Sequence, residues 1–331
     1  MRVGLVYNRH LPSLYDAMGE SAAESGVMEA VRAVRRALRA LGHDFTEVPL
    51  SPPLERVRET LAGIQADVIF NLFEGFAGLP MTEAAVAGII EDLRLPFTGS
   101  PAAALALTLD KPEAIQALRA RGVRTPNYQL LDMDNLDSFN LDFPCIVKPR
   151  ADDASHGLSE RSVVFDRDAL FHEVRTMVER YDGAPALVEA FLGGREFNAT
   201  VWGVKNPEVL PLSEIMYSLP DGLPKILTFA AKWEPHSMYF KHTAVKCPAE
   251  VTKELGAEIR EAAMAAFLAA GCRGYGRVDM RLDRDGRPVV MEINANPDIA
   301  PGTGVARQAK AAGYSYKGMV EAIINFGLES S

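Results

Sequence analysis

The stretch from Gly276 to Asn294 constrains the fold of this chain more than any other part of its sequence. The dipeptide Asp285-Gly286 within it is the pair most favoured in a two-residue β-hairpin turn, so two paired strands are predicted around it. With that turn, Asp279 faces Glu292 across the hairpin. Because side chains alternate between the two faces of a strand, one face is predicted to be charged and the other apolar and buried.

The charged face carries ligands that a divalent cation would take. It is predicted to hold Arg277, Asp279, Glu292 and Asn294, and the apolar face to hold Val278, Met280, Leu282, Val289, Met291 and Ile293. Two carboxylates that face each other on a sheet repel, so a cation is expected between them. Carboxylate and amide oxygens suit Mg²⁺, which completes its shell with water and substrate phosphates. The alternative is a solvated polar face whose charges Arg277 balances.

A second stretch places a lysine at the end of an apolar strand. Residues 143–148 are predicted to form that strand, and a loop that ends in Ser155, His156 and Gly157 follows it. The ammonium of Lys148 could neutralise phosphate oxygens while backbone N–H groups of the loop cover them. The alternative is an ordinary surface lysine, because the Walker pattern Gly-x-x-x-x-Gly-Lys-Ser/Thr is absent from the sequence.

The order of apolar runs and helical patterns predicts an α/β chain of three units. Residues 1–104 are interpreted as an N-terminal α/β substrate domain, 105–187 as a small α+β unit and 188–331 as a C-terminal unit with the hairpin and a lid loop. The expected strands lie at 1–7, 67–73, 143–148, 161–165, 186–191, 196–204 and 208–217, with the hairpin at 275–294. The expected helices lie at 27–41, 82–93, 111–115, 168–181, 249–270 and 316–326, and residues 218–246 are predicted to form a loop-like lid.

Composition argues against several classes of protein. The chain of 331 residues is 48% hydrophobic and 24% charged, as in globular proteins, and its formal net charge of -9 disfavours a nucleic-acid partner. Its cysteines, Cys145, Cys247 and Cys272, have no metal-binding spacing, so neither a disulfide framework nor a structural zinc is expected. A secretion signal and a membrane span are not expected either, and a cytoplasmic location is predicted.

Several blocks of the sequence resemble the ATP-grasp enzymes of the D-alanine–D-alanine ligase family, in that family's order and near its spacing. The blocks are residues 109–111, 143–149, 188–197, 231–233, 276–279 and 291–297. The resemblance implies an ATP-grasp fold, in which an N-terminal Rossmann-like (pre-ATP-grasp) domain precedes two α+β subdomains that hold ATP between them. It also implies a ligase that phosphorylates a carboxylate to an acyl phosphate. An amine then attacks, giving a dipeptide or amide, ADP and phosphate.

The resemblance also implies roles for individual residues. Those implied to bind ATP are Lys111, Lys148 and Ser155 at the phosphates, Glu189 and Leu192 at the adenine, and Glu196 at the ribose. The implied metal ligands are Asp279, Glu292 and Asn294, normally for two Mg²⁺ ions, which Mn²⁺ could replace. The implied catalytic residues are Arg277, which would steady the tetrahedral intermediate, and Lys232 in the mobile loop that closes the site.

The predicted substrate pocket departs from the family pattern. Glu24 is the candidate for the glutamate that binds the donor amine, whereas Ala154 and Trp233 stand where the family has a serine and a tyrosine. Thr303 stands where a serine holds the acceptor carboxylate. These changes predict a donor other than D-alanine, one that is larger or less dependent on side-chain contacts to its amine. Alternatively, Glu24 and the longer 8–20 loop restore the amine site.

A nucleotide-binding module of ATP-grasp fold without catalysis, serving regulation or protein interaction, is the alternative function. Retention of Arg277, the three metal ligands and both lysines argues against it, because binding alone would not need the arginine. A two-metal hydrolase is a third alternative, and it is disfavoured because the sequence offers no obvious base to activate water. The expected partners are small-molecule amino acids or amines, without nucleic acid or membrane, and a homodimer is one form that the protein could take.

Overall fold

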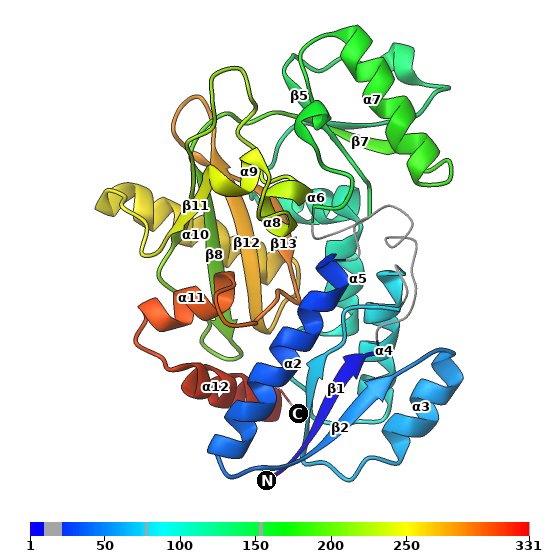
Figure 1. The fold of residues 1–331 in the computed structure, drawn as a ribbon, viewed down its shortest axis with the longest axis vertical. Helices are drawn as coiled ribbons and strands as arrows, with labels where there is room; N and C mark the ends of the chain where they lie inside the picture. The colour runs from blue at the N-terminus through cyan, green and yellow to red at the C-terminus, as the bar shows by residue number, and fades with distance from the viewer. Residues whose placement is uncertain (10–21, 77–78, 152–154, 331) are drawn as a thin grey trace.

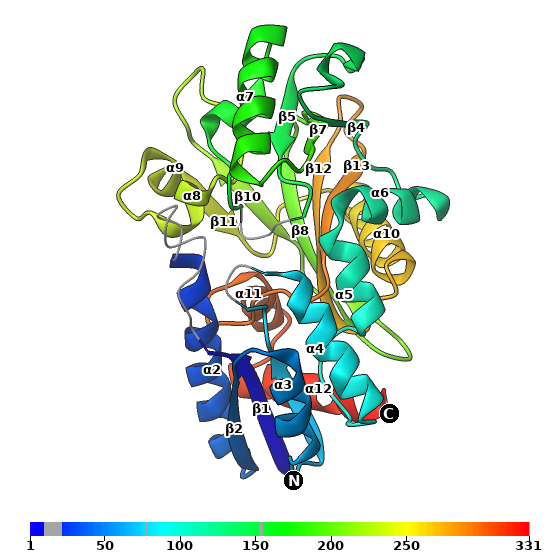
Figure 2. The same ribbon diagram turned by 90° about the vertical axis from the view of Figure 1, so that its right-hand side faces the viewer.

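The structure, a computed structural model, describes residues 1–9, 22–76, 79–151 and 155–330, with side chains from residue 26 onward in the second range. The described residues form three sheets, each in one region of the chain. In two perpendicular views, the six-stranded C-terminal sheet lies between the N-terminal sheet at one end and the small middle unit at the other (Figures 1 and 2). None of the described helices is both long and apolar enough to cross a lipid bilayer.

The N-terminal unit is a parallel sheet covered by helices. Its strands are β1 (Arg2–Asn8), β2 (Asp44–Leu50) and β3 (Val68–Leu72), in the order β2-β1-β3, and its helices are α2 (Ala22–Ala40), α3 (Leu54–Ala62) and α4 (Met81–Asp92). Every residue of β3 is buried, as expected for a strand of a parallel sheet covered on both faces. Gly42, at a φ of 72°, ends the turn after α2. Strand β2 and helix α3 were not predicted.

The middle unit is an antiparallel sheet with one long helix. Its strands are β4 (Tyr128–Leu131), β5 (Cys145–Lys148), β6 (Val163–Val164) and β7 (Ala186–Ala190), in the order β4-β7-β5-β6. Helices α5 (Ala102–Leu109) and α6 (Lys111–Ala120) precede it, η1 (Leu136–Ser138) and η2 (Glu160–Ser162) are short 3-10 helices within it, and α7 (Arg167–Arg180) packs on the sheet. The boundary expected after residue 187 falls inside β7.

The C-terminal unit is built on the largest sheet. Its strands are β8 (Glu196–Gly203), β9 (Glu208–Val209), β10 (Ser213–Tyr217), β11 (Thr243–Lys246), β12 (Gly274–Leu282) and β13 (Pro288–Asn294), in the order β11-β10-β8-β12-β13, with β9 also paired to β8. Its longer helices are α10 (Lys253–Ala269), α11 (Gly304–Ala311) and α12 (Tyr316–Glu329). Apolar side chains of α10 pack against β8, β12 and β13, and leave the opposite face of these strands for polar residues.

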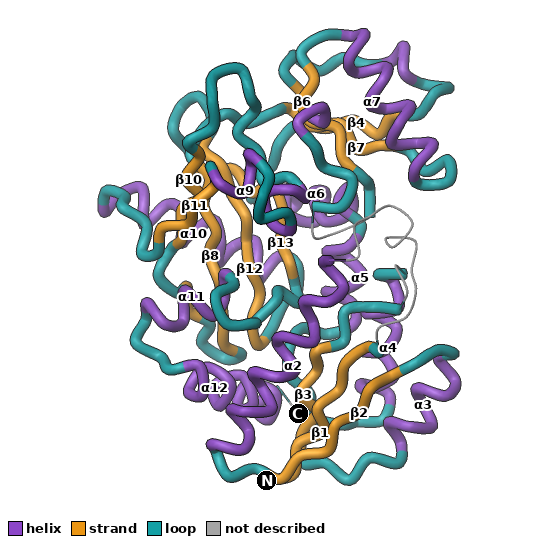
Figure 3. The backbone as a smooth tube through the Cα atoms, viewed as in Figure 1, coloured by secondary structure: helices purple, strands orange, loops and turns teal. Residues whose placement is uncertain are grey.

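The lid region is more regular than the predicted loop. Residues 218–246 contain helices α8 (Phe229–Trp233) and α9 (Met238–Lys241) and then strand β11, which pairs with β10 (Figure 3). The hydroxyls of Thr228 and Ser237 cap the two helices. The strand predicted at 208–217 is interrupted, because residues 210–212 separate β9 from β10.

The hairpin confirms the predicted pairing but not the predicted turn. Gly286 donates its N–H to the carbonyl of Asp283 and has a φ of 77°, so the turn is a three-residue loop with glycine in the left-handed region. A bulge between Asp279 and Met280 offsets this change, and Asp279 still faces Glu292. The bulge changes the face to which two side chains of β13 point. Met291, which was predicted to lie in the core, lines a cavity, and Val290 is buried in the core instead.

Candidate active site

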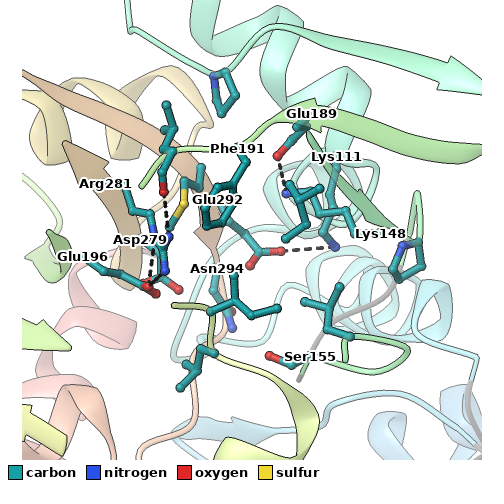
Figure 4. A pocket seen from close by; sticks show the side chains of 18 of the residues that line it. Lys111, Lys148, Ser155, Glu189, Phe191, Glu196, Asp279, Arg281, Glu292 and Asn294 are labelled. Atoms are coloured by element: carbon teal, nitrogen blue, oxygen red, sulfur yellow. Dashed lines mark hydrogen bonds and ion pairs between the residues drawn. The ribbon is translucent and has the colours of Figure 1, made fainter. Parts of the chain in front are cut away.

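A cavity of about 990 Å³, including its open mouth, lies between the middle sheet and the polar face of the C-terminal sheet (Figure 4). Strands β5, β7, β8, β12 and β13, helix α6 and lid helix α8 all contribute to its wall. All the residues expected to bind ATP or metal, or to take part in catalysis, line it: Lys111, Lys148, Ser155, Glu189, Leu192, Glu196, Lys232, Arg277, Asp279, Glu292 and Asn294.

The two lysines predicted at the phosphates are buried and each is paired with a carboxylate. The Lys148 Nζ lies 2.7 Å from Glu189 Oε2, and the Lys111 Nζ lies 3.1 Å from Glu292 Oε1 (Figure 4). Both lysines are less than a tenth exposed, at 8% and 7%. The alternative of ordinary surface lysines is therefore wrong, because both side chains are buried. Their ion pairs account for that burial, since lysine is almost never buried unless it is paired.

Helix α6 places Lys111 by means of its first turn. The Asp110 carboxylate caps the helix by accepting the N–H of Glu113, and Pro112 occupies the first turn, where its missing N–H costs nothing. Arg150, beyond the end of β5, donates two hydrogen bonds to the same carboxylate, at 3.0 and 2.7 Å. The elements that carry Lys111 and Lys148 are thereby joined.

The charge of Glu292 is stabilised by surrounding lysines. Burial alone would raise the pKa of this carboxyl group, but Lys111, Lys148 and Lys232 outweigh that effect and lower its pKa to about 2. Glu292 is therefore ionised at neutral pH. An anionic oxygen with three ammonium groups nearby forms a site that could accommodate phosphates or a metal.

The other carboxylate of the hairpin is held in a fixed orientation. Asp279 accepts two parallel hydrogen bonds from the Arg277 guanidinium, both at 2.9 Å, and a third from Asn198 Nδ2 at 2.7 Å. Gly304 leaves space for Arg277, since a Cβ at that position would lie 3.3 Å from Arg277 Cδ. Asn198 was not predicted, although it faces Asp279 in the register of β8 and β12.

The donor set of the hairpin fits a hard divalent cation. Asp279, Glu292 and Asn294 all present oxygens to one cavity, and ionised carboxylates have lone pairs beyond those already used. Among the described residues, no three His, Cys, Asp or Glu side chains form a metal cluster. Two carboxylates and an amide match the open Mg²⁺ sites that substrate phosphates complete.

An arginine that was not predicted lies at the other end of the cavity. Arg281 donates to Glu196 Oε2 from its Nε at 3.0 Å, and Tyr217 donates its hydroxyl to the same oxygen at 2.6 Å. The alternation that places Arg277 and Asp279 on the cavity face places Arg281 there too, so the signal was present in the sequence.

Between the two ends, the cavity has an apolar part with one polar acceptor. Ile146, Phe191, Leu227 and Met291 line it, and Glu189 lies beside them. The Glu189 carboxylate is 2% exposed, and its Oε1 is buried with no hydrogen-bond partner among the described residues. A buried acceptor without a partner is costly, so it fits a flat apolar ligand that carries an amino group.

The lid contacts both the middle unit and the N-terminal unit. The Phe229 ring of α8 lies 5.5 Å from the ring of His156, and α8 also carries Lys232. The Trp233 ring packs on α2, where a Cβ at Gly26 would lie 3.5 Å from Trp233 Cη2. Trp233 does not line the cavity.

The remaining substrate predictions have different outcomes. The Glu24 side chain and Ala154 lie outside the described residues. Thr303 does not line the cavity, and its hydroxyl is directed to the backbone carbonyls of Asp298 and Ala300, at 2.9 and 2.8 Å. Because a hydroxyl has a single hydrogen, Thr303 would have to release these carbonyls before it could donate to a substrate carboxylate.

Comparisons with known proteins place these features in context. A family model described as D-ala D-ala ligase C-terminus matches residues 119–325. The chain is 34% identical over 258 residues to the uncharacterized protein y4sG of Sinorhizobium fredii, covering 78% of this chain and 74% of that protein. It is 30% identical over 307 residues to a D-alanine–D-alanine ligase of Carboxydothermus hydrogenoformans, covering 90% and 92%.

The fold is also similar to that of solved structures. The structure of D-alanine–D-alanine ligase from Bacillus anthracis complexed with ATP matches with a TM-score of 0.76, at 23% identity, over 100% of this chain and 97% of that one. The predicted ATP-grasp fold is thereby confirmed.

Proposed function

Because the chain belongs to the D-alanine–D-alanine ligase family, we propose that it is an ATP- and Mg²⁺-dependent carboxylate–amine ligase. The observation that carries the proposal is the single cavity that brings together the two buried lysines, the carboxylates of the hairpin and Arg277. A carboxylate resists amine attack because oxide is a poor leaving group. Phosphorylation replaces that oxide with phosphate.

The nucleotide end of the site is formed by Glu189 and the apolar residues beside it. The free Oε1 of Glu189 would accept a hydrogen bond from the amino group of adenine, and Glu196 would accept one from a ribose hydroxyl. Lys148 and Lys111 would then face the phosphates, whose charge they neutralise. Ser155, in the loop after β5, would cover the phosphates from the other side.

The metal end consists of Asp279, Glu292 and Asn294. When bound there, Mg²⁺ would neutralise phosphate charge as the γ-phosphoryl group leaves ADP for the substrate carboxylate. The Arg277–Asp279 ion pair fixes the plane of one ligand. Lys111 holds Glu292, and both contacts keep the ligands in place before the reactants arrive.

The second step needs a positive charge beside the acyl carbon and the exclusion of water. The amine nitrogen forms the new C–N bond as its free base, and inorganic phosphate departs with the electron pair of the broken C–O bond. Arg277 is the cation that would face the oxygen developing negative charge. Lys232 on α8 would enter with the lid, which shields the acyl phosphate from hydrolysis.

The donor is proposed to be an amino acid other than D-alanine. An ammonium group needs charged or polar partners when it is buried, and Ala154 and Trp233 supply fewer of them than the family's serine and tyrosine. The indole of Trp233 lies outside the cavity wall and packs on α2 at Gly26, two residues from Glu24, so a broad apolar side chain would lie beside the proposed site for the donor amine. That surface suits a bulky or aromatic donor better than alanine.

The test is ADP release over a matrix of amino acids and amines, with the mass of each product measured. We expect an amide or dipeptide product, and a lower kcat/KM for D-alanine as donor than for a larger amino acid. A kcat/KM for D-alanine above that of every other donor would contradict the donor proposal alone. Nucleotide binding without ADP release across the matrix would instead favour the non-catalytic alternative.

A further inference from the structure

Arg281 is the centre of a buried polar junction at the nucleotide end of the cavity. Its guanidinium donates to Glu196 Oε2 and, at 2.6 Å, to the carbonyl of Leu192, and it also donates to the carbonyl of Lys225. Arg281 is 3% exposed and Glu196 is 5% exposed. Figure 4 shows the two side chains next to each other at the cavity wall.

The junction joins segments that are distant in the sequence. Leu192 lies in the connection from β7 to β8, between the middle and C-terminal sheets, and Lys225 lies in the lid segment. The rings of Phe191 and Tyr217 lie 5.4 and 5.7 Å from the guanidinium carbon of Arg281. A rigid guanidinium between two rings can direct several N–H groups at once, which a lysine ammonium cannot do in the same geometry.

The hydrogen bonds to the Glu196 carboxylate from described residues all go to one of its two oxygens. Arg281 and Tyr217 donate to Oε2, whereas Oε1 accepts no hydrogen bond from any described residue. Arg281 therefore fixes which oxygen of Glu196 remains available to a ligand.

We propose that Arg281 is a positioning residue for the nucleotide sugar, which holds Glu196 Oε2 so that Oε1 accepts a hydrogen bond from a ribose hydroxyl. This inference rests on the proposed function, in which Glu196 binds the ribose of ATP. Since the same guanidinium binds the carbonyls of Leu192 and Lys225, it also keeps the connection between the two sheets and the lid base next to the sugar.

The test is calorimetric titration of ADP, 2′-deoxy-ADP and 3′-deoxy-ADP in the presence of Mg²⁺ and without amine substrate. We expect the wild-type protein to bind ADP at least about fivefold more tightly than one of the deoxy nucleotides. In Arg281→Met, the Kd for ADP should rise about tenfold or more, and the preference should fall to within about twofold. Arg281→Lys keeps the charge but loses the fork of donors, so its preference should be intermediate.

Arg195→Met is the matched control. Arg195 also makes a two-point ion pair, with Glu214 at 2.7 Å, and lies 5.0 Å from the ring of Phe197, but it does not line the cavity. Its loss should reduce thermal stability and leave the preference for ribose unchanged. Circular dichroism of each variant reports folding, and if Arg281→Met does not fold, Arg281→Lys decides the question.

A wild-type preference that persists in a folded Arg281 variant would overturn the inference, as would a wild-type protein that binds all three nucleotides equally. Failure of the proposed function would look different. It would give a protein with the expected ribose preference and no product in the amine matrix, whereas a protein that binds no adenine nucleotide would overturn both.

Discussion

Charged side chains of the cavity form ion pairs with one another. Lys111 and Lys148 each contact a carboxylate, and Arg277 holds Asp279 with two hydrogen bonds. Such pairing makes the burial of several charges tolerable, and it also means that removal of one partner leaves the other buried and uncompensated. Substitutions that keep shape and change charge are therefore the most informative.

Glu292→Gln should lower the rate of ADP formation by more than about a hundredfold while the protein stays folded. The amide keeps the shape of the side chain but removes the charge that would bind the metal and that Lys111 contacts. ADP release at saturating Mg²⁺ measures the effect, and thermal unfolding reports the fold. Turnover within about tenfold of wild type would reject the metal assignment.

Lys111→Met and Lys148→Met should each raise the KM for ATP or lower kcat by more than about tenfold, because methionine keeps much of the packed stem and removes the charge. Steady-state kinetics with varied ATP measure the change. Lys205→Met is the control, since Lys205 is exposed in the segment between β8 and β9. Unchanged kinetics in both cavity variants would mean that neither ammonium contacts the phosphates.

Glu173→Gln should stabilise the protein at pH 7. Glu173 on α7 is 6% exposed, and burial raises its pKa, although a hydrogen bond from Ser162 partly opposes that change. A carboxyl group whose pKa is higher in the folded state contributes stability at low pH, and that contribution is lost as the pH rises through the folded pKa. The gain in melting temperature over wild type should therefore be present at pH 7 and disappear near pH 3. An equal gain at both pH values would show that the charge of Glu173 is not responsible.

At the scale of elements, a side chain of helix α11 supplies hydrogen bonds to the backbone of β8, the strand that carries Asn198. The strand pairing to β8 is interrupted between β9 and β10, and there the amide of Gln308 on α11 bonds to the backbone of β8. Gln308 is fully buried, accepts the N–H of Thr200 at 2.7 Å and donates to the carbonyl of Asn198 at 2.8 Å. Helix α11 thereby fixes the strand whose Asn198 side chain holds Asp279.

Gln308→Leu should lower the free energy of unfolding by about 2–4 kcal/mol, because it leaves a buried N–H and a buried C=O without partners. Denaturant unfolding measures the loss, and the exposed Gln116 of α6 provides the control substitution Gln116→Leu. A Gln308 variant as stable as the control would mean that water or a neighbouring group replaces the amide.

Sequence patterns predicted the main strands and helices of the site well and its short elements poorly. Periodicity located β12 and β13, yet alternation cannot reveal a one-residue bulge, so Met291 was placed on the wrong face. Helices α8 and α9 have too few residues to show a helical period. Of the side chains, Arg281 could have been found by extending the alternation. Gln308 instead bonds to backbone groups of β8 that lie 108 and 110 residues earlier in the sequence, so no local signal identifies it.

At the scale of the whole molecule, the hydrophobic clusters do not follow the three predicted units. One buried cluster contains Val6 and Val48 of the N-terminal sheet together with Phe197 and Val278 of the C-terminal sheet. Another cluster lies wholly within the middle unit, with Val147, Val188 and residues of α7. Figure 1 shows the middle unit beyond the end of the large sheet.

This arrangement predicts how the molecule opens. Because the N-terminal and C-terminal sheets share one apolar cluster, they should lose structure together, whereas the middle unit can open by itself. Amide hydrogen exchange followed by mass spectrometry should show peptides from β5, β7 and α7 exchanging as one group, with a lower opening free energy than peptides from β1 and β12. Equal protection of all these peptides would show a single cooperative unit. In the expected case, nucleotide that bridges the two sheets would slow exchange most in the middle unit, and protection there would report occupancy of the cavity.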